Sequence, residues 1–208
     1  MTDAAAKLAP VFIRHGYIFL YLCRRGQGLS ADQGAFIQDL LRGQKGDEAR
    51  KHLQFILLTT DQLDDTVAGL SFLKKLPGVD PHRIAVVGHS FGGQLALLAA
   101  ERDSSIRALV TFGAAANSWE SVPEIRERLL IAVRSATVPI MLLQASNDFS
   151  TAPGKAMDAE LTRLAKPHAL KIYPAVGQTP EDGHNFVHTD IDLWEPDVFR
   201  FLDGYVGH

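Results

Sequence analysis

Residues 83–94 read Arg-Ile-Ala-Val-Val-Gly-His-Ser-Phe-Gly-Gly-Gln, and this stretch decides the fold. The apolar run 84–87 predicts a buried strand that ends at Gly88, and a helical stretch rich in alanine and leucine begins two or three residues after Ser90. Gly-x-Ser-x-Gly between a strand and a helix makes a tight turn that lifts the serine hydroxyl clear of the backbone. The missing Cβ atoms of Gly88 and Gly92 would let the strand and the helix approach closely. Ser90 is therefore the candidate nucleophile, and the alternative is a glycine-rich turn that merely contains a serine.

The helix after Ser90 would serve the same chemistry. Its first turn carries backbone N–H groups and the positive end of the helix dipole, and both suit a developing oxyanion. The backbone N–H of Phe91 is the predicted oxyanion donor.

The hexapeptide at 88–93, Gly-His-Ser-Phe-Gly-Gly, resembles the nucleophile elbow of the α/β-hydrolase superfamily. The preceding residues 76–84, Leu-Pro-Gly-Val-Asp-Pro-His-Arg-Ile, resemble the approach to that elbow in dienelactone-hydrolase-like and prolyl-oligopeptidase-like members. The similarity runs from about residue 12 to the C-terminus. Dienelactone hydrolase proper carries cysteine where this chain has Ser90, and the difference favours a general serine esterase over the namesake reaction.

Predicted strands and helices alternate along the chain, which is typical of a parallel sheet between two layers of helices. Five apolar runs predict strands, at 17–22, 84–87, 108–112, 138–143 and 169–173. Helical patterns occupy 3–14 with Gly16 as C-cap, 61–76, 91–101, 123–135, 153–165 and a final helix that includes 198–205. We expect one domain, a three-layer α/β sandwich with a mainly parallel sheet of about five strands, which is a truncated α/β-hydrolase fold. Short helices within 31–58 are a candidate partial lid.

A serine nucleophile needs a base and an acid that orients the base, and in this fold they follow in the order Ser, Asp or Glu, His. Asp148 directly follows the strand 138–143 and precedes a helix, at the same sheet edge as Ser90. Asp158 falls inside a helix and Asp182 follows the wrong strand. Asp148 is the predicted acid, and its alternative role is that of a helix cap.

The predicted base is His184. The segment 181–186, Glu-Asp-Gly-His-Asn-Phe, resembles the family's Gly-His-x-Phe and follows the last strand. His188 follows the same strand and is the alternative base. His89 is not the predicted base, because the turn exposes Ser90 and not His89. His168 is not the predicted base either, because it precedes the last strand and so lies at the opposite end of the strands from Ser90.

Three residues are predicted to bind substrate, and each rests on its position near a strand end. Arg25 lies in the segment 24–30, which corresponds in the resemblance to an R-G-x-G-x-S loop bordering the active site. Trp119 could line an acyl pocket, and Phe149 follows the predicted acid. The alternatives are that Arg25 forms surface ion pairs and that Trp119 packs under the next helix.

The resemblance also implies a second oxyanion donor, from a loop after the family's third strand, and we expect this chain to lack that strand and loop. Losing one donor costs roughly 10²–10³ in rate. The absent strand would separate 17–22 from 83–87, so either these two segments pair directly or another protomer fills the gap. An uncovered edge and apolar surface near 17–22 invite self-association, and we expect a homodimer or larger assembly.

Composition excludes several classes of function. The chain has 208 residues, 46% of them hydrophobic, and a net charge of −3 with scattered Lys and Arg, so we expect no nucleic-acid partner. No run is long enough to span a membrane, and the N-terminus, with Asp3 and Lys7, does not resemble a signal peptide. Cys23 is the only cysteine, which fits a reducing cytoplasm. Neither a metal-ligand grouping nor a phosphate-binding loop stands out, so no metal and no cofactor are expected.

These features together predict a cytoplasmic serine hydrolase that cleaves a small-molecule carboxylic ester through an acyl-enzyme. Ser90 would attack, His184 would transfer protons and Asp148 would orient His184. A peptidase or amidase of the prolyl-oligopeptidase-like kind is one alternative. A truncated hydrolase domain that is weakly active or non-catalytic is the other.

Overall fold

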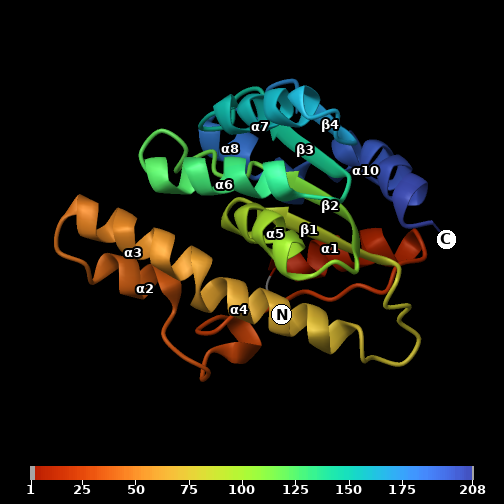
Figure 1. Ribbon diagram of the computed structural model, residues 1–208, viewed down its shortest axis with the longest axis horizontal. Coiled ribbons are helices and arrows are strands. Elements are labelled where there is room, and N and C mark those ends of the chain that lie inside the picture. The colour runs from red at the N-terminus through yellow and green to blue at the C-terminus, as the bar shows by residue number, and fades with distance from the viewer. Residues whose placement is uncertain (1–2, 208) are drawn as a thin grey trace. The chain divides into compact units, whose positions relative to one another are not determined.

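The computed structural model describes residues 3–207, which form two compact units that divide after Val79. The second unit, from Asp80 onward, holds the sheet (Figure 1). Its four strands are β1 (Ile84–His89), β2 (Ile106–Phe112), β3 (Ile140–Ala145) and β4 (His168–Tyr173). All pair in parallel in the order β1-β2-β3-β4, and each overlaps a predicted strand.

The register aligns the carboxyl ends of the strands. His89 pairs with Phe112, Phe112 pairs with Leu143, and Ala145 pairs with Tyr173. In a parallel sheet, the loops that leave those ends meet at one edge, where α/β proteins carry their sites. Residues that directly follow β1, β2 and β3 are therefore brought together from distant parts of the sequence.

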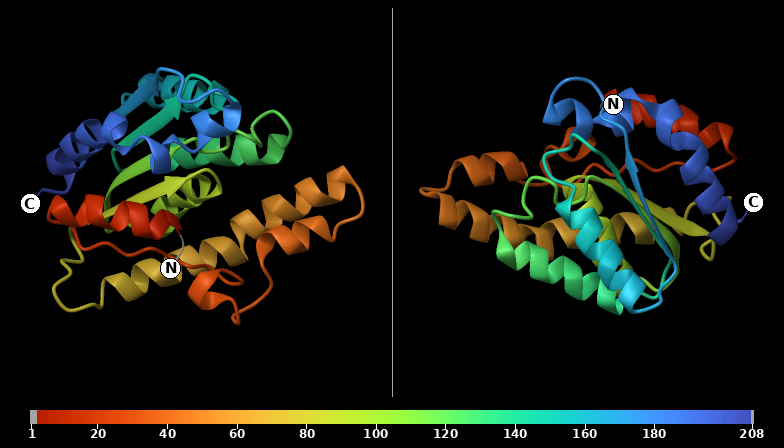
Figure 2. Two further views of the ribbon diagram at one scale, coloured as in Figure 1. Left: turned by 180° about the vertical axis from the view of Figure 1, so that it is seen from behind. Right: turned by 90° about the horizontal axis from the view of Figure 1, so that it is seen from above.

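Helices cover both faces of this sheet (Figures 1 and 2). One face carries α5 (Phe91–Arg102), α6 (Pro123–Ser135) and α7 (Ala152–Arg163), and the other carries α10 (Ile191–Tyr205). The core between the layers is mostly apolar. Its fully buried side chains include Leu98, Val110, Ile125, Leu142 and Trp194. The predicted three-layer α/β arrangement is confirmed.

The predicted fifth strand is wrong. Residues 17–24 contain neither strand nor helix, and β1 pairs only with β2 among the described strands. The side chain of Ile18 is 55% exposed, and Leu20 and Tyr21 are exposed as well, so the run is not buried on both faces. An apolar run shows that a segment can form a strand, but a ladder of hydrogen bonds to a neighbour makes it one. The direct pairing of 17–22 with the strand before Ser90, which is β1, is likewise not formed.

The first unit consists of helices. They are α1 (Asp3–Arg14), the short 3₁₀-helix η1 (Gly28–Ser30), α2 (Ile37–Arg42), α3 (Asp47–Thr59) and α4 (Asp61–Leu73). Gly16 ends α1 as predicted, at φ +80°, where glycine avoids strain. Its N–H donates to Ile13, and the N–H of Tyr17 donates to Phe12, which is the Schellman pattern. Within 3–207, no helix is both long and apolar enough to cross a bilayer.

Two short helices that the sequence analysis did not predict follow β4. These are α8 (Pro180–His184) and α9 (Phe186–Thr189). Thr179 caps α8, because its hydroxyl accepts from the N–H of Asp182 while the carboxylate of Asp182 accepts from the N–H of Thr179. The sequence Thr-Pro-Glu-Asp at 179–182 carries the capping signal for this helix. Hydrophobic periodicity does not reveal the helix, because five residues are too few to show a period.

Glu160 on α7 generates a prediction about stability. It accepts from Arg163 at 2.8 and 3.0 Å and from Arg134 of α6 at 2.6 Å. First Arg163 and then Arg134 lower the pKa of Glu160 from its ordinary value of 4.5 to about 2. A lowered carboxylate pKa stabilises the fold above the unfolded-state value, and this stabilisation is lost as the pH falls toward 2.

We therefore expect Glu160→Gln to lower the free energy of unfolding at pH 7, and the gap to wild type to shrink steadily between pH 5 and pH 3. Urea denaturation across that range measures it. Glu124→Gln on α6, outside this ion-pair network, is the matched control and should show no such trend. A stability difference between Glu160→Gln and wild type that stays constant with pH would contradict the lowered pKa of Glu160.

Candidate active site

Ser90 sits on the turn between β1 and α5. Its backbone lies at φ 54° and ψ −119°, a strained conformation for a residue with a side chain, which costs roughly 1–3 kcal/mol. The N–H of Ser90 donates to the carbonyl of Phe112 over 2.8 Å, so β2 holds the turn in place. In this conformation the Oγ atom of Ser90 meets the imidazole of His184.

Close packing of β1 on α5 depends on glycine, as predicted, but the second position is Gly93 and not Gly92. A Cβ on Gly88 would overlap the carbonyl oxygen of Gly92. A Cβ on Gly93 would lie 2.9 Å from the Cβ of Ala114 and 3.2 Å from the oxygen of Gly88. A Cβ on Gly92 would meet nothing within 4 Å. The close approach therefore requires Gly88 and Gly93, and the expectation for Gly92 is wrong because its Cα faces open space.

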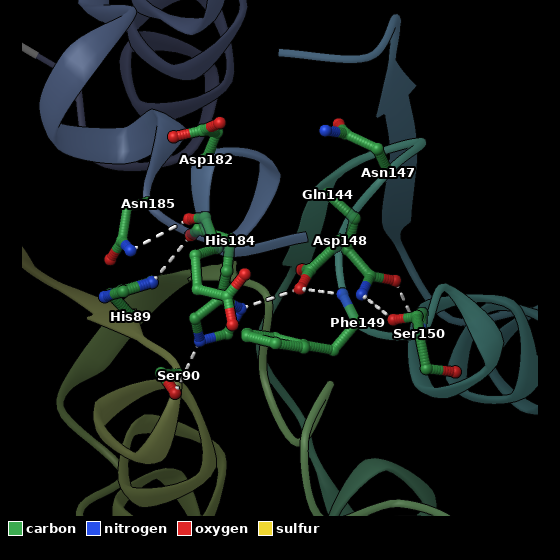
Figure 3. Close-up of polar contacts among 12 residues, drawn as sticks. His89, Ser90, Gln144, Asn147, Asp148, Phe149, Ser150, Asp182, His184 and Asn185 are labelled. Carbon is green, nitrogen blue, oxygen red and sulfur yellow. Dashed lines mark hydrogen bonds and ion pairs between the residues drawn. The ribbon is translucent and has the colours of Figure 1, made fainter. Parts of the chain in front are cut away.

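The structure brings Ser90, Asp148 and His184 into one hydrogen-bonded chain (Figure 3). The Nε2 atom of His184 lies 2.8 Å from the Oγ atom of Ser90. Its Nδ1 atom lies 2.7 Å from Oδ1 of Asp148. Both Asp148 and His184 are buried. This geometry allows a proton to pass from the serine hydroxyl to the imidazole while the carboxylate holds the other ring nitrogen.

The carboxylate of Asp148 is oriented by its own loop and by Gly113 at the end of β2. Its Oδ1 also accepts from the N–H of Phe149 at 2.8 Å. Its Oδ2 is buried and accepts no hydrogen bond within residues 3–207. Gly113, at φ +56°, lies against this pair, and a Cβ there would be 2.8 Å from Oδ2 and 2.9 Å from Nδ1 of His184. The missing side chain of Gly113 leaves the room that the acid and base occupy.

Two amide side chains fix the loops, and the sequence analysis missed both. Asn147 donates to the carbonyls of Val176 and Thr179 at 2.8 and 2.9 Å and accepts from the N–H of Val176 at 2.9 Å. Gln144 donates to the carbonyl of Ser150 at 2.7 Å and accepts from the N–H of Gly154 at 3.2 Å. Asn147 therefore ties the acid's loop to the segment that leads into α8. Their closeness to Asp148 in the sequence was the only sign that these two residues belong to the site. It does not reveal their hydrogen-bond partners.

The other histidines near the site take different places. The ring of His89 packs on that of His184 with centroids 4.7 Å apart, and the ring of His188 meets His89 edge-on at 5.1 Å. Burial first, then the neighbouring His184 and His188, lower the pKa of His89 from 6.5 to about 3. His184, and not the alternative base His188, bonds both Ser90 and Asp148.

The three predicted substrate-binding residues differ in their surroundings. Phe149 is 40% exposed and its ring meets that of His184 edge-on at 5.2 Å, so it offers apolar surface beside the base. Trp119 is only 4% exposed. Arg25 belongs to the first unit, where Asp61 and Asp65 pair with its guanidinium at 2.9 and 2.8 Å. Substrate binding by these three residues stays a prediction. Within residues 3–207, no cluster of His, Cys, Asp or Glu could hold a metal ion.

A model of the dienelactone hydrolase family matches residues 30–192. No curated protein matches the chain. Among solved structures, the Pyrococcus furiosus esterase Pf2001 is 16% identical, with 99% of this chain and 78% of that chain covered and a TM-score of 0.68. This similarity shows an α/β-hydrolase fold.

Peptidases are structural neighbours as well. Dipeptidyl peptidase 4 of Porphyromonas gingivalis is 19% identical over 77% of this chain, with a TM-score of 0.56. The Pyrococcus horikoshii acylaminoacyl peptidase is 14% identical over 77% of this chain, with a TM-score of 0.57. This chain spans only 25% and 31% of the lengths of these two peptidases. At such identities the likeness concerns the fold.

The position of Gly113 generates a prediction. Gly113→Ala should push the carboxylate and the imidazole apart, because its Cβ would fall inside contact distance of both. A displacement of about 1 Å can cost about 10²-fold in rate, and we expect a loss of that order in kcat for a short p-nitrophenyl ester.

Gly46→Ala is the matched control. Gly46 also has a positive φ, of +94°, but its Cβ would meet nothing within 4 Å. It should show the backbone strain as a lower melting temperature without the loss of kcat. Equal kcat values for the two variants would contradict the steric role of Gly113.

Proposed function

This chain belongs to the dienelactone hydrolase family, and from that premise we propose that it is a serine hydrolase that cleaves small carboxylic esters. The observation that carries the proposal is the continuous hydrogen-bonded chain from Ser90 through His184 to Asp148. A serine hydroxyl is a weak nucleophile, and a base within 2.8 Å whose far nitrogen is held by a buried carboxylate activates it.

Acylation would proceed as follows. His184 Nε2 takes the proton of Ser90, and Oγ attacks the ester carbonyl carbon. The carbonyl oxygen becomes an oxyanion beside the N–H of Phe91, the first residue of α5, where the helix dipole also favours negative charge. His184 then returns its proton to the alkoxide as the C–O bond breaks. An alcohol leaves, and the acyl group remains on Ser90.

Deacylation repeats the same steps with water. His184 takes a proton from water, the hydroxide attacks the acyl carbon, and the proton passes to Ser90 Oγ as its bond to the acyl group breaks. A carboxylic acid leaves and the enzyme is restored. Asp148 keeps the proton of the neutral imidazole on Nδ1 and stabilises the imidazolium that forms in each half-reaction.

Two other candidate functions can be distinguished by experiment. Peptidases among the structural neighbours favour amide cleavage as the second candidate, and competing ester and anilide substrates distinguish it by their kcat/KM values. A weakly active or non-catalytic domain is the third candidate. It predicts little or no turnover and little or no covalent labelling.

A fluorophosphonate tests the nucleophile directly, because it forms a covalent adduct with an activated serine. We expect labelling of wild type at Ser90, located by peptide mass spectrometry. Ser90→Ala should abolish both labelling and ester hydrolysis while the melting temperature stays near that of wild type, since the residue lies on a turn. Activity retained in Ser90→Ala would refute the assignment.

His184→Ala and Asp148→Asn test the base and the acid. Both should lower kcat by about 10³–10⁴-fold, and Asp148→Asn should act by favouring the wrong imidazole tautomer. His188→Ala is the control, because it alters a neighbouring histidine that does not bond Ser90. A severe loss in His188→Ala with a mild one in His184→Ala would mean that the base is misassigned.

We also propose that the chain forms a homodimer. Support comes from β1, whose second edge pairs with no described strand, and from apolar side chains exposed in the first unit, including Ile18 at 55% and Leu29 at 91%. Unpaired strand edges and exposed apolar surface promote association, and two-fold pairing is the commonest result. Light scattering at micromolar concentration should give twice the mass of 22.8 kDa. A stable monomer would refute the dimer.

A further inference from the structure

His89 makes one contact that the proposed mechanism does not use. Its Nε2 atom lies 2.8 Å from the main-chain carbonyl oxygen of His184 (Figure 3). A carbonyl oxygen can only accept, so Nε2 carries the proton and donates it. The last residue of β1 thus holds the backbone of the residue whose imidazole bonds Ser90.

The carbonyl that His89 holds lies at a helix end. His184 is the last residue of α8, a helix of five residues that is followed by the cap Asn185. Carbonyls in the last turn of a helix have no partner inside the helix and must find one elsewhere. Without His89, the peptide group that follows the His184 Cα would be freer to rotate, and the imidazole would move with it.

The ring of His89 is well suited to a permanent donor role. Its low pKa, about 3, keeps it neutral at ordinary pH, and the carbonyl of His184 selects the tautomer with hydrogen on Nε2. A neutral ring is also compatible with its neighbour's chemistry. The centroids are 4.7 Å apart, and a second cation at that distance would oppose formation of the His184 imidazolium.

We propose, resting on the serine-hydrolase function above, that His89 is a positioning residue that fixes His184 relative to Ser90 through its hydrogen bond to the His184 carbonyl. His89 and Ser90 are adjacent in the chain, so the end of β1 carries both the nucleophile and the contact that holds the main chain of the base. The side chain of His184 is held separately, by Asp148 at Nδ1. The two constraints together set the 2.8 Å separation between Nε2 and Oγ.

The competing explanation is that the ring of His89 serves only for packing. Variants that keep or remove the N–H donor at this position distinguish the two explanations. His89→Gln keeps an N–H donor at nearly the reach of Nε2 but removes the ring. His89→Leu removes the donor and keeps apolar bulk. His89→Asn keeps an amide that is too short to reach the carbonyl, and it also serves if the leucine variant does not fold.

For a short p-nitrophenyl ester, we expect His89→Leu and His89→Asn to lower kcat about 10- to 100-fold with little change in KM, because positioning is lost while binding is kept. His89→Gln should retain kcat within about threefold of wild type by the same reasoning. Near-wild-type kcat in folded His89→Leu or His89→Asn would overturn the proposal. A folded His89→Gln as impaired as the other two would overturn it in favour of packing.

His168→Leu is the matched control. The ring of His168 also bonds a main-chain carbonyl, that of Lys166, at 2.7 Å, but it lies at the start of β4, at the opposite end of the strands from Ser90. Its removal should lower stability at most and leave kcat unchanged. A loss of kcat in His168→Leu equal to that in His89→Leu would show a general effect of histidine removal and overturn the proposal.

A proton NMR measurement tests positioning without turnover. The Nδ1–H of His184, in its 2.7 Å hydrogen bond to Asp148, should give a downfield resonance that Asp148→Asn shifts or removes. We expect this resonance in wild type and in His89→Gln, and broadening or loss in His89→Leu. An unchanged resonance in His89→Leu would overturn the positioning role. Absence of fluorophosphonate labelling in wild type would refute the serine-hydrolase function instead, so the two failures are distinguishable.

Discussion

The turn at Ser90 is the constraint on which the rest of the site depends. A residue with a side chain is held at positive φ there, and the fold must offset the resulting strain. Gly88 makes the turn possible because a side chain at that position would collide with the backbone of α5. The hydrogen bond from the Ser90 N–H to Phe112 fastens the turn to the next strand, deep in a buried sheet. The nucleophile therefore stands at the end of a buried strand, and the groups that act on it come from the segments that follow β3 and β4.

The loops are brought to Ser90 by parallel pairing and then fixed by hydrogen bonds. Each strand end contributes one part of the site: β2 provides the space at Gly113, β3 provides Asp148, and the segment after β4 provides His184. Loops lose conformational entropy when they are ordered, so each needs contacts of its own. Asn147 supplies three hydrogen bonds to the segment that leads to α8. In our proposal, His89 supplies the matching contact from the side of the nucleophile.

Burial explains the electrostatics of the site. The carboxylate of Asp148 is taken out of water, and its bonds to His184 and to the Phe149 N–H offset part of that cost. Burial likewise disfavours the charged form of His89, which lowers its pKa and leaves a neutral donor beside the base. Two histidines whose rings are in contact can thus differ in role, because one is paired with a carboxylate and the other with a carbonyl.

The sequence by itself determined the α/β alternation and the four strands of the sheet, because hydrophobic periodicity is a local property of the chain. It determined Ser90 through the Gly-x-Ser-x-Gly turn, whereas Asp148 and His184 followed from the chain order and the Gly-His-x-Phe segment that the family resemblance implies. Only the tertiary structure decided that 17–22 is not a strand, since a strand needs a hydrogen-bonded neighbour and the apolar run cannot specify one. Only it decided that Gly93 and not Gly92 is the close contact, and that Asn147 and His89 hold the loops. These contacts join residues up to 95 positions apart and end on main-chain groups, which every residue type carries, so no pattern of side chains in the sequence specifies them.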